Sequence, residues 1–328
     1  MKVPSYLLAL SCLALSCNGS SGSRGDGGSG SGTSATLVRA CAELAASQCD
    51  KEKACSPSGF QRQFADVETC VARSQLTCPI IASATGSGYT ASTVAACAKA
   101  LAAATCADLA NNLGPAECRI RGTLAVGAAC MDDAQCSGTE NFCSLSGECG
   151  VCAARKPVSG PVAFTDCGSS QGCQDGLVCD LNRCLPPVAP TDACDLGHPC
   201  PAPYACDNGK CIPATLGLGA VCDIYGNACD DSQGLRCVDS ACIVMPTARL
   251  GETCGLQGNL VTFCIAGAVC DVVQGNYLGK CQPPLADGDA CDDQPYIYDL
   301  CQPPATCTGG FCNFPEPLAC APADAGRD

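Results

Sequence analysis

Cysteine is the residue type in this chain that could carry the most chemistry, since it accounts for 36 of the 328 residues. Such a density is typical of disulfide scaffolds, in which sulfur is structural and not catalytic. Cys149 and Cys152 have the tight C-x2-C spacing of a redox dithiol or of half a zinc site. No second C-x2-C pair follows and no βαβ pattern surrounds them, so we predict no metal site. A thiol redox protein that uses Cys149 and Cys152 is kept as an alternative function.

Other catalytic groups are scarce. The one histidine, His198, stands in a turn between Gly197 and Pro199, and a Ser-His-Asp or Cys-His arrangement would have to use it. No nucleophile-elbow motif is present, and there is no tryptophan. The sequence therefore predicts that this protein is not an enzyme and needs no cofactor.

Pairs of aspartates recur after cysteines, and carboxylates could bind calcium. The pairs are Asp132-Asp133, Asp230-Asp231 and Asp292-Asp293. Calcium needs six or more oxygen ligands from a shaped loop, and no EF-hand spacing is present. We interpret the pairs as turn-forming aspartates on solvated edges.

Aromatic residues give the one positional hint of a binding surface. Six of the 14 Phe and Tyr residues lie between Phe263 and Phe314, where the loops between cysteines are longest (255–263, 271–280 and 292–300). Tyrosine is a common contact residue at interfaces. We predict a binding site made of Tyr277, Tyr296, Tyr298 and Phe311. The alternative is that these rings cover small hydrophobic patches over the disulfides.

The N-terminus carries an export signal. An apolar run over 6–15 follows Met1-Lys2, and it is too short to span a bilayer. Ala14-Leu15-Ser16-Cys17 resembles a bacterial lipobox, which predicts a signal peptide over 1–16 and lipidation at Cys17. Cleavage there leaves an even number of cysteines for disulfides. The alternatives are lipidation at Cys12, where the same pattern occurs, or an ordinary signal peptide and a secreted protein.

The net charge and the composition limit the kinds of partner that the protein could bind and the compartment in which it could fold. The net charge of −14 argues against binding to nucleic acid or to anionic membrane surfaces. We expect contact with the membrane only through the N-terminal lipid, and a partner that is an unknown extracellular protein or surface ligand. Residues 17–35 are rich in Gly and Ser and should form a flexible tether. Cysteines this dense need an oxidising compartment, so the protein should be exported to the cell surface or outer membrane.

Residues 36–120 should form a three-helix domain stapled by disulfides. Apolar residues of 37–45 fall at helical spacing, acids open a helix near Asp66, and Thr90 or Ser92 precedes an alanine-rich helix. Eight cysteines suffice for four disulfides between the helices. Six of them form three pairs that are eight or nine residues apart in the sequence, so the two members of each pair should lie on one face of a helix. Those pairs are Cys41 with Cys49, Cys70 with Cys78 and Cys97 with Cys106, and Cys55 and Cys118 complete the set.

Residues 121–328 repeat a pattern of four cysteines, which predicts a semi-rigid string of six hairpin modules. Their approximate bounds are 126–153, 160–187, 190–213, 217–244, 249–284 and 286–320. Asn-Gly and Gly-Gly between the last two cysteines favour two-residue turns. Of three possible connectivities we favour first-to-third and second-to-fourth. In the first module the quartet is Cys130, Cys136, Cys143 and Cys149.

Two cysteines, Cys152 and Cys320, fall outside the six quartets. They could pair with each other. Alternatively, the first module could use a different frame of four cysteines.

Two resemblances accompany these patterns. Residues 130–184, with Cys130-MDDAQ-Cys136 and Cys149-Gly-Val-Cys152, resemble the N-terminal cysteine-rich region of Dickkopf proteins. The double cysteine of that family is missing, so its disulfide pairing and its Wnt antagonism are not carried over. The whole chain resembles the cysteine-rich surface lipoproteins of myxobacteria, which implies a location and not an activity.

These observations predict a small disulfide-rich fold and a non-enzymatic function. We expect a cell-surface lipoprotein that presents rigid disulfide-bonded modules for adhesion or recognition. A secreted, disulfide-rich enzyme inhibitor or effector is an alternative, since small disulfide modules often present rigid loops to enzymes.

Overall fold

A computed structural model describes thirteen segments of the chain. They are 34–110, 114–146, 149–155, 173–174, 177–180, 183–188, 192–195, 200–201, 204–222, 229–258, 260–272, 277–291 and 301–314. The predicted signal peptide, the lipidation site and residues 17–33 of the predicted tether lie outside the described residues, as do His198, Asp292-Asp293, Tyr296, Tyr298 and Cys320. The last two tether residues, Ser34 and Ala35, instead begin the first helix.

The N-terminal part is helical, as predicted, but its described residues form six α-helices and not three. They are α1 (Ala35–Cys55), α2 (Pro57–Gln63), α3 (Val67–Ser74), α4 (Thr77–Ser83), α5 (Ala91–Ala103) and α6 (Cys106–Ala110), and the 3-10 helix η1 (Ala116–Cys118) follows. The three helices that the sequence did not reveal, α2, α4 and α6, have seven, seven and five residues. At about 3.6 residues per turn they are too short to show a hydrophobic period.

Side chains fix where the longer helices begin. Ser34 Oγ accepts a hydrogen bond from the Leu37 amide at the start of α1, and Asp66 Oδ1 accepts one from the Thr69 amide at the start of α3. At α5, Thr90 and Thr93 form a reciprocal capping box, so Thr90 is the N-cap. These bonds satisfy amides that have no partner within their own helix.

Four disulfides staple the helical part, as the sequence predicted, and three of them begin on α1. The expectation that neighbouring cysteines share one helix is correct for Cys41 and Cys49 but wrong for the other two pairs, whose members lie on separate helices. Cys41 and Cys49 lie on α1 and bond to Cys78 of α4 and Cys70 of α3. The remaining disulfides of this part are Cys55–Cys106 and Cys97–Cys118. The largest buried cluster lies in this part of the chain, with Leu44, Ile81, Val94 and Ala98 among its members.

The strands of the rest of the described chain form small sheets, which are antiparallel except where β10 pairs with β12 in parallel. Its strands are β1 (Ala129–Cys130), β2 (Asn141–Ser146), β3 (Cys149–Ala154), β4 (Val178–Asp180), β5 (Arg183–Leu185), β6 (Tyr204–Asp207), β7 (Lys210–Pro213), β8 (Leu235–Val238), β9 (Ala241–Val244), β10 (Thr247–Ala248), β11 (Thr253–Gln257), β12 (Leu260–Cys264), β13 (Val269–Val272), β14 (Leu278–Gln282), β15 (Thr306–Thr308) and β16 (Phe311–Asn313). Two further 3-10 helices are η2 (Asp133–Gln135) and η4 (Asp231–Gln233). The sheets are β1-β3-β2, β10-β12-β11-β14-β13 and four two-stranded hairpins, β4-β5, β6-β7, β8-β9 and β15-β16.

Two-residue turns close several hairpins, as the sequence predicted. Asn208 and Gly209 join β6 to β7 with positive φ angles of 48° and 76°, and Gly309 and Gly310 join β15 to β16 with 63° and 81°. Two consecutive residues with positive φ define the turn whose twist matches paired strands. Gly tolerates this conformation because it has no Cβ.

The predicted disulfide connectivity is confirmed in four of the cysteine quartets. First-to-third and second-to-fourth pairs are Cys194–Cys206 with Cys200–Cys211, Cys222–Cys237 with Cys229–Cys242, Cys254–Cys270 with Cys264–Cys281, and Cys291–Cys307 with Cys301–Cys312. The bond Cys173–Cys184 is also a second-to-fourth pair. The same bonding order therefore recurs along the chain.

The first quartet was assigned wrongly. Cys130 bonds to Cys143, but Cys136 bonds to Cys152 and not to Cys149. Cys152 therefore takes the fourth place and does not pair with Cys320, so the alternative of a different frame is correct. In β3, Cys152 is directly opposite Cys143 in the antiparallel ladder, which is the position that fourth cysteines occupy in the other hairpins. Cys149 is itself disulfide-bonded.

A corner turn recurs at the start of four of these units. Gly127, Gly219, Gly251 and Gly288 all have φ between 77° and 86°, and each amide donates to the carbonyl of the last cysteine of its unit. Those acceptors are Cys152, Cys242, Cys281 and Cys312, at 2.7 to 2.8 Å. The residue before each glycine is Val126, Leu218, Leu250 or Asp287. The hydrogen bond ties the start of each unit to its end.

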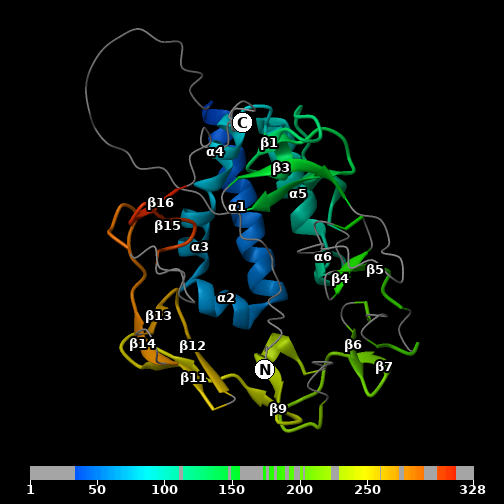
Figure 1. The fold of residues 1–328 in the computed structure, drawn as a ribbon, viewed down its shortest axis with the longest axis vertical. Helices are drawn as coiled ribbons and strands as arrows, with labels where there is room; N and C mark the ends of the chain where they lie inside the picture. Colours follow the sequence, from blue (N-terminus) through cyan, green and yellow to red (C-terminus); the bar gives the residue numbers. More distant parts are fainter. Residues whose placement is uncertain are drawn as a thin grey trace, which may run out of the picture.

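The hairpins do not extend away from the helices as a string. They follow an arc around α1, and the last of them returns to α3 (Figure 1). Arg73 of α3 forms a bidentate ion pair with Asp287 at 2.8 Å, and also donates to the carbonyls of Gln302 and Pro303. Its guanidinium lies 5.9 Å from the ring centre of Phe314. We call this set of contacts the Arg73 latch.

A second contact ties α2 to the five-stranded sheet. The amides of Ala266 and Gly267, in the turn after β12, donate to the carbonyls of Gln61 and Arg62 at the end of α2. The Arg62 guanidinium lies 4.9 Å from the ring centre of Phe263. The last four carbonyls of a helix lack partners within it, so the turn satisfies groups that α2 leaves open.

The Arg73 latch yields a prediction about the closed arc. Arg73→Ala removes a partly buried bidentate pair and leaves Asp287 without its partner, so it should destabilise the fold by about 2–4 kcal/mol. Arg73→Lys keeps the charge but loses the planar fork, and should recover only part of that loss. The urea midpoint measures the loss of stability, and the radius of gyration from small-angle scattering measures whether the arc opens.

Arg39 is the matched control, because it is exposed and pairs with Glu43 one turn along α1. Arg39→Ala should change the urea midpoint and the radius of gyration little. An Arg73→Ala protein as stable and compact as the Arg39→Ala control would contradict the latch.

Candidate functional site

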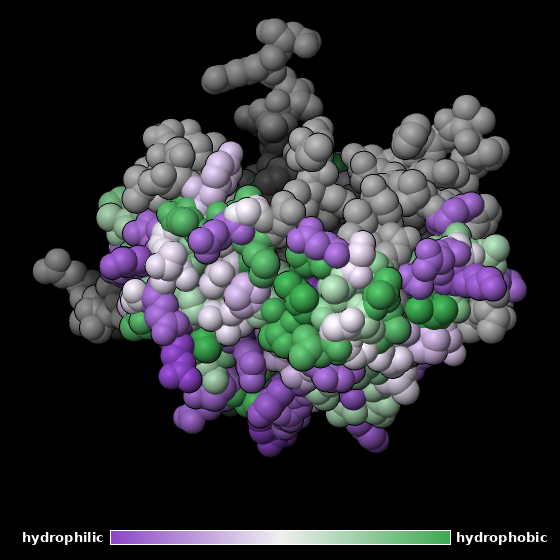
Figure 2. Space-filling model, turned by 90° about the horizontal axis from the view of Figure 1, so that it is seen from below, coloured by the Kyte–Doolittle hydropathy of each residue, from purple (hydrophilic) through white to green (hydrophobic). Residues whose placement is uncertain are grey.

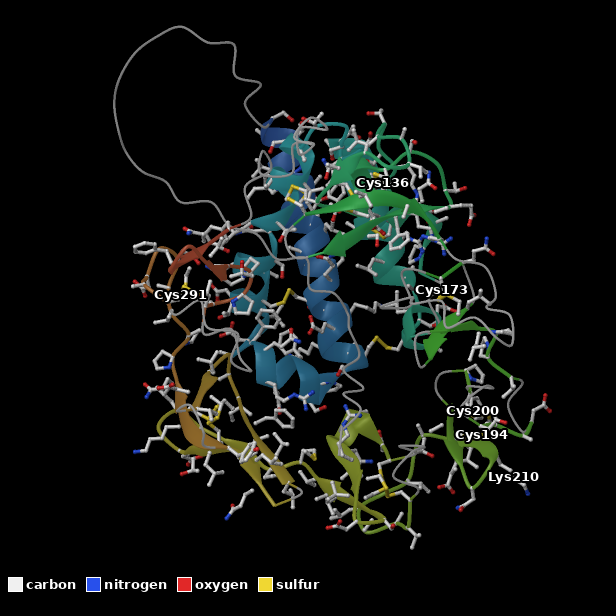
Figure 3. The ribbon with its side chains drawn as sticks, viewed as in Figure 1. Cys136, Cys173, Cys194, Cys200, Lys210 and Cys291 are labelled. Atoms are coloured by element: carbon white, nitrogen blue, oxygen red, sulfur yellow. A yellow bond between two sulfur atoms is a disulfide. The ribbon has the colours of Figure 1, made fainter. Side chains whose placement is uncertain are left out.

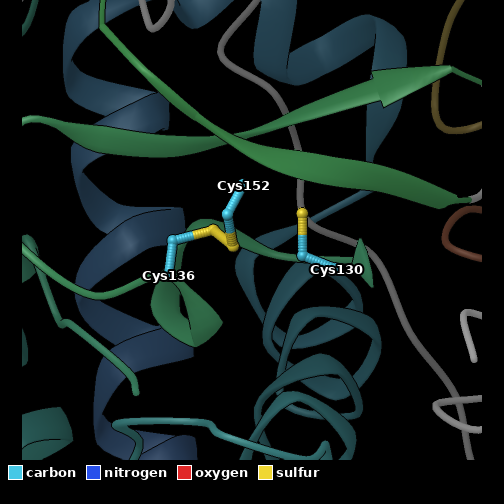
Figure 4. A group of neighbouring side chains, drawn as sticks. All are labelled: Cys130, Cys136 and Cys152. Atoms are coloured by element: carbon cyan, nitrogen blue, oxygen red, sulfur yellow. A yellow bond between two sulfur atoms is a disulfide. The ribbon is translucent and has the colours of Figure 1, made fainter. Parts of the chain in front are cut away.

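The cysteine clusters have the spacing of metal sites but not the chemistry. Five groups of three cysteines hold their sulfur atoms within 4.8 Å of one another. One is Cys130, Cys136 and Cys152, in which the Cys136–Cys152 bond is visible and Cys130 belongs to the bond with Cys143 (Figure 4). A second group contains Cys194 and Cys200, and another contains Cys291; these three residues are labelled in Figure 3. All five arise where two disulfides pack together, and a metal needs thiolates.

Cys149 and Cys152 do not form a redox pair with one another. Cys152 is buried and bonded to Cys136 at 2.02 Å, and Cys149 is disulfide-bonded as well. A C-x2-C dithiol needs both sulfur atoms in one exchangeable bond. Here the two residues stand on the same strand, β3, and Cys152 bonds away from Cys149.

The aspartate pairs differ from one another, contrary to the prediction of solvated edges throughout. Asp230 is as expected: it caps η4 at the surface, and hydrogen bonds from Ser232 and Gln233 lower its pKa. Asp132 caps η2 in the same manner but is only 6% exposed, and burial raises its pKa to about 7. Desolvation of a carboxylate without a cation partner accounts for the difference. The prediction of a solvated edge is wrong for Asp132.

The aromatic residues of the C-terminal region divide into two groups. Phe263 and Phe314 face arginines of α2 and α3, and Phe314 also packs on the cluster around Cys301 and Cys312. Phe314 thus agrees with the alternative that rings cover a disulfide. These two rings hold the sheets against the helices, so they are not free for a partner.

Tyr277 and Phe311 remain available at the surface. Tyr277 is 69% exposed and precedes β14, while Phe311 is 52% exposed on β16. The Tyr277 carbonyl accepts a hydrogen bond from the Leu256 amide at 2.7 Å, and Leu256 is opposite Val261 in the ladder. Tyr277 and Leu256 are therefore neighbours across two strands, and both are exposed. Because residues opposite one another on adjacent strands share a face of the sheet, we expect the exposed side chains of Tyr277 and Leu256 to lie on the same face.

The predicted binding residues come from two separate sheets. Tyr277 belongs with the five-stranded sheet and Phe311 with the β15-β16 hairpin, next to it along the arc (Figure 1). Tyr296 and Tyr298 lie outside the described residues. A site that combines all four residues stays a prediction.

The sequence interpretation passed over a set of exposed aliphatic residues. Val126, Leu218 and Leu250, which precede the corner glycines, are all exposed, and Leu218 reaches 69%. Val221, Val244 and Leu256 are exposed as well. Apolar side chains gather at the centre of the lower face of the molecule (Figure 2), the end that β9 and β11 occupy in Figure 1. The signal was present as an apolar residue and glycine ahead of the first cysteine, but that pattern did not reveal its exposure.

Comparison with known proteins gives no family. The chain matches no family model, no curated protein and no solved structure. Within the described residues, no helix has the length and apolarity that a membrane span requires.

The disulfide geometry predicts the outcome of a thiol titration. Native protein should show no reactive thiol at Cys149 or Cys152, because both sulfur atoms are already oxidised. Labelling with a maleimide before and after denaturation, followed by peptide mass spectrometry, measures this. Cys136→Ser is the control, since it releases Cys152 as a thiol that labels on unfolding. Two labelled thiols in the untreated native protein would favour the redox alternative.

Proposed function

We propose that this protein is an exported, non-enzymatic recognition or adhesion protein, anchored at the cell surface through a lipid on Cys17. The observation that carries the proposal is the exposure of large apolar side chains on strands and turns that disulfides hold fixed. Tyr277, Phe311 and Leu218 are each more than half exposed. A backbone that disulfides already hold in place loses little conformational entropy on binding, so side chains on it are suited to contact a partner.

The chemistry of the described residues supports a binding role. The cysteines of the five sulfur clusters are committed to disulfides, and Asp132 and Asp230 act as caps of short helices. Extensive disulfide bonding suggests an exported or extracellular protein. The net charge of −14 favours a partner with a basic or neutral surface.

The finer architecture belongs to the same proposal. We take 121–328 as six tandem modules and 17–35 as a tether that separates them from the membrane. The recurring corner turn and disulfide order in four units support the repeat. The lipobox-like Ala14–Cys17 and the resemblance to myxobacterial surface lipoproteins support the location.

A binding experiment tests the proposal. The full ectodomain is immobilised and exposed to the surface fraction of the cells that produce it, and captured material is crosslinked and identified. Tyr277→Ser and Phe311→Ser should each weaken the affinity for the captured partner by about 30-fold, the scale of an aromatic hot spot. Val38→Ser, which alters an exposed apolar residue of α1, is the matched control and should keep full affinity.

Two results would overturn this proposal. One is the absence of any saturable partner at micromolar ectodomain. The other is unchanged affinity in both aromatic variants with intact far-ultraviolet and near-ultraviolet spectra, which would place the contact elsewhere on the chain.

A further inference from the structure

The loop around η2 lies buried where the helical part meets the first sheet. Asp132 Oδ1 accepts a hydrogen bond from the Ala134 amide at 2.8 Å, and Gln135 Oε1 accepts from the amides of Met131 and Asp132. The Gln135 side chain then donates through Nε2 to the carbonyl of Thr85, just after α4, at 2.8 Å. One capping box thus holds the loop and binds it to the helices.

Backbone contacts make this loop a joint between the two parts of the fold. The Gly88 amide donates to the Ala134 carbonyl at 2.8 Å, and the Thr123 amide donates to the Gly86 carbonyl at 2.9 Å. The approach is so close that a Cβ at Gly88 would collide with the Arg121 carbonyl. Met131 and Ala134 also belong to the main helical core, with Ile81 and Val94. We call residues 131–135 and their contacts with 85–88 the η2 joint.

Few ionisable groups surround Asp132. Those that face it are Asp133 in the same loop and Tyr89, which precedes α5. Asp133 accepts a hydrogen bond from the Cys143 amide at 2.8 Å and lies 3.4 Å from an Arg155 nitrogen, and Arg121 also acts on it. The arginines therefore compensate Asp133, whereas the groups that face Asp132 directly are another acid and a phenol.

From this geometry we propose that the η2 joint is a pH-sensitive contact: it is tight when Asp132 is protonated and is loosened when Asp132 ionises. A protonated carboxyl keeps its acceptor bond to the Ala134 amide without a charge in the core. An ionised one is buried beside the Asp133 carboxylate, and water must enter or the loop must move to solvate it. Loosening there would free the first sheet from the helices.

The direction of the pH dependence follows from the folded and unfolded states. Burial is the largest influence and raises the pKa of Asp132 from 3.8 to about 7, and burial also raises the pKa of Asp133 despite its arginine neighbours. The folded joint then binds more protons than the open one between about pH 4 and pH 7, so its stability falls as pH rises through that window. Tyr89 stays neutral there, because burial raises its pKa above the usual value.

The chain contains its own control in Asp230. It caps the three-residue helix η4 through hydrogen bonds with Ser232, as Asp132 caps η2, but at the surface. Hydrogen bonds from Ser232 and Gln233 lower the pKa of Asp230, in the opposite direction to that of Asp132. Asp132→Asn and Asp230→Asn both keep an acceptor for the capping amide and remove the carboxylate. The two sites differ in burial, and Asp230 also accepts hydrogen bonds from the side chains of Ser232 and Gln233.

Hydrogen exchange of the full, oxidised protein tests the joint. The amides of Gly88, Thr123 and Ala134, corrected for intrinsic rates, should open about ten- to a hundredfold more often at pH 8 than at pH 5. In Asp132→Asn this dependence should shrink to the part that Asp133 contributes, and in Asp230→Asn it should remain. Equal protection at pH 5 and pH 8 in the unmodified protein would overturn the proposal, as would an undiminished dependence in Asp132→Asn.

A direct titration guards against a misfolded Asp132→Asn variant. The carboxyl carbon of Asp132 is followed by NMR in the unmodified protein, with the Asp132→Asn spectrum used only for assignment. A midpoint more than about 1.5 pH units above the reference for aspartate supports the joint, and a smaller shift overturns it.

Discussion

Covalent closure of short loops is the constraint on which the hairpins of this protein depend. Their disulfides join cysteines 11 to 17 residues apart, and each contributes on the order of 3 kcal/mol in the loop-entropy model. A unit of about 30 residues cannot bury enough apolar surface to offset its chain entropy. The buried clusters of the hairpins accordingly consist mainly of the cysteines themselves. Larger apolar side chains are therefore not required inside, and several remain at the surface.

Contacts of two arginines hold the last hairpin and the five-stranded sheet to the helices. The two-stranded β15-β16 hairpin is held to α3 by Arg73, which binds carbonyls, a carboxylate and a ring face, and Arg62 of α2 contacts the ring of Phe263 in the five-stranded sheet. The first sheet differs, because Met131 and Ala134 pack in the apolar core of the helices. Guanidinium groups suit the contacts of the two arginines, because they donate several hydrogen bonds in one plane and stack on aromatic rings. Aromatic residues near the C-terminus thus serve two purposes, with Phe263 and Phe314 turned to the helices and Tyr277 and Phe311 turned outward.

The sequence patterns predicted the features that repeat along the chain, and they did not predict contacts that occur at one place. The disulfide order and the Asn-Gly and Gly-Gly turns recur, so their spacing carried the prediction. The return of the last hairpin to α3 rests on Arg73 and Asp287, which are 214 residues apart, and on carbonyls that any residue could supply. The frame of the first quartet was missed because Cys149 and Cys152 fit the spacing almost equally, and only the register of β3 with β2 separates them. Of the four predicted binding residues, the structure describes two, and places them in neighbouring sheets.

The corner turn closes four units in the same way and leaves the side chain before its glycine outside the unit. Its glycine and its bond to the last cysteine are common to four units, so the preceding side chain is left outside the unit in each. In the last unit that side chain is Asp287, and it binds α3. In three others it is Val126, Leu218 or Leu250, and it is exposed. Since the turn accepts an aspartate at this place, it does not require an apolar side chain, and the exposure of Val126, Leu218 and Leu250 is a feature that the turn itself does not explain.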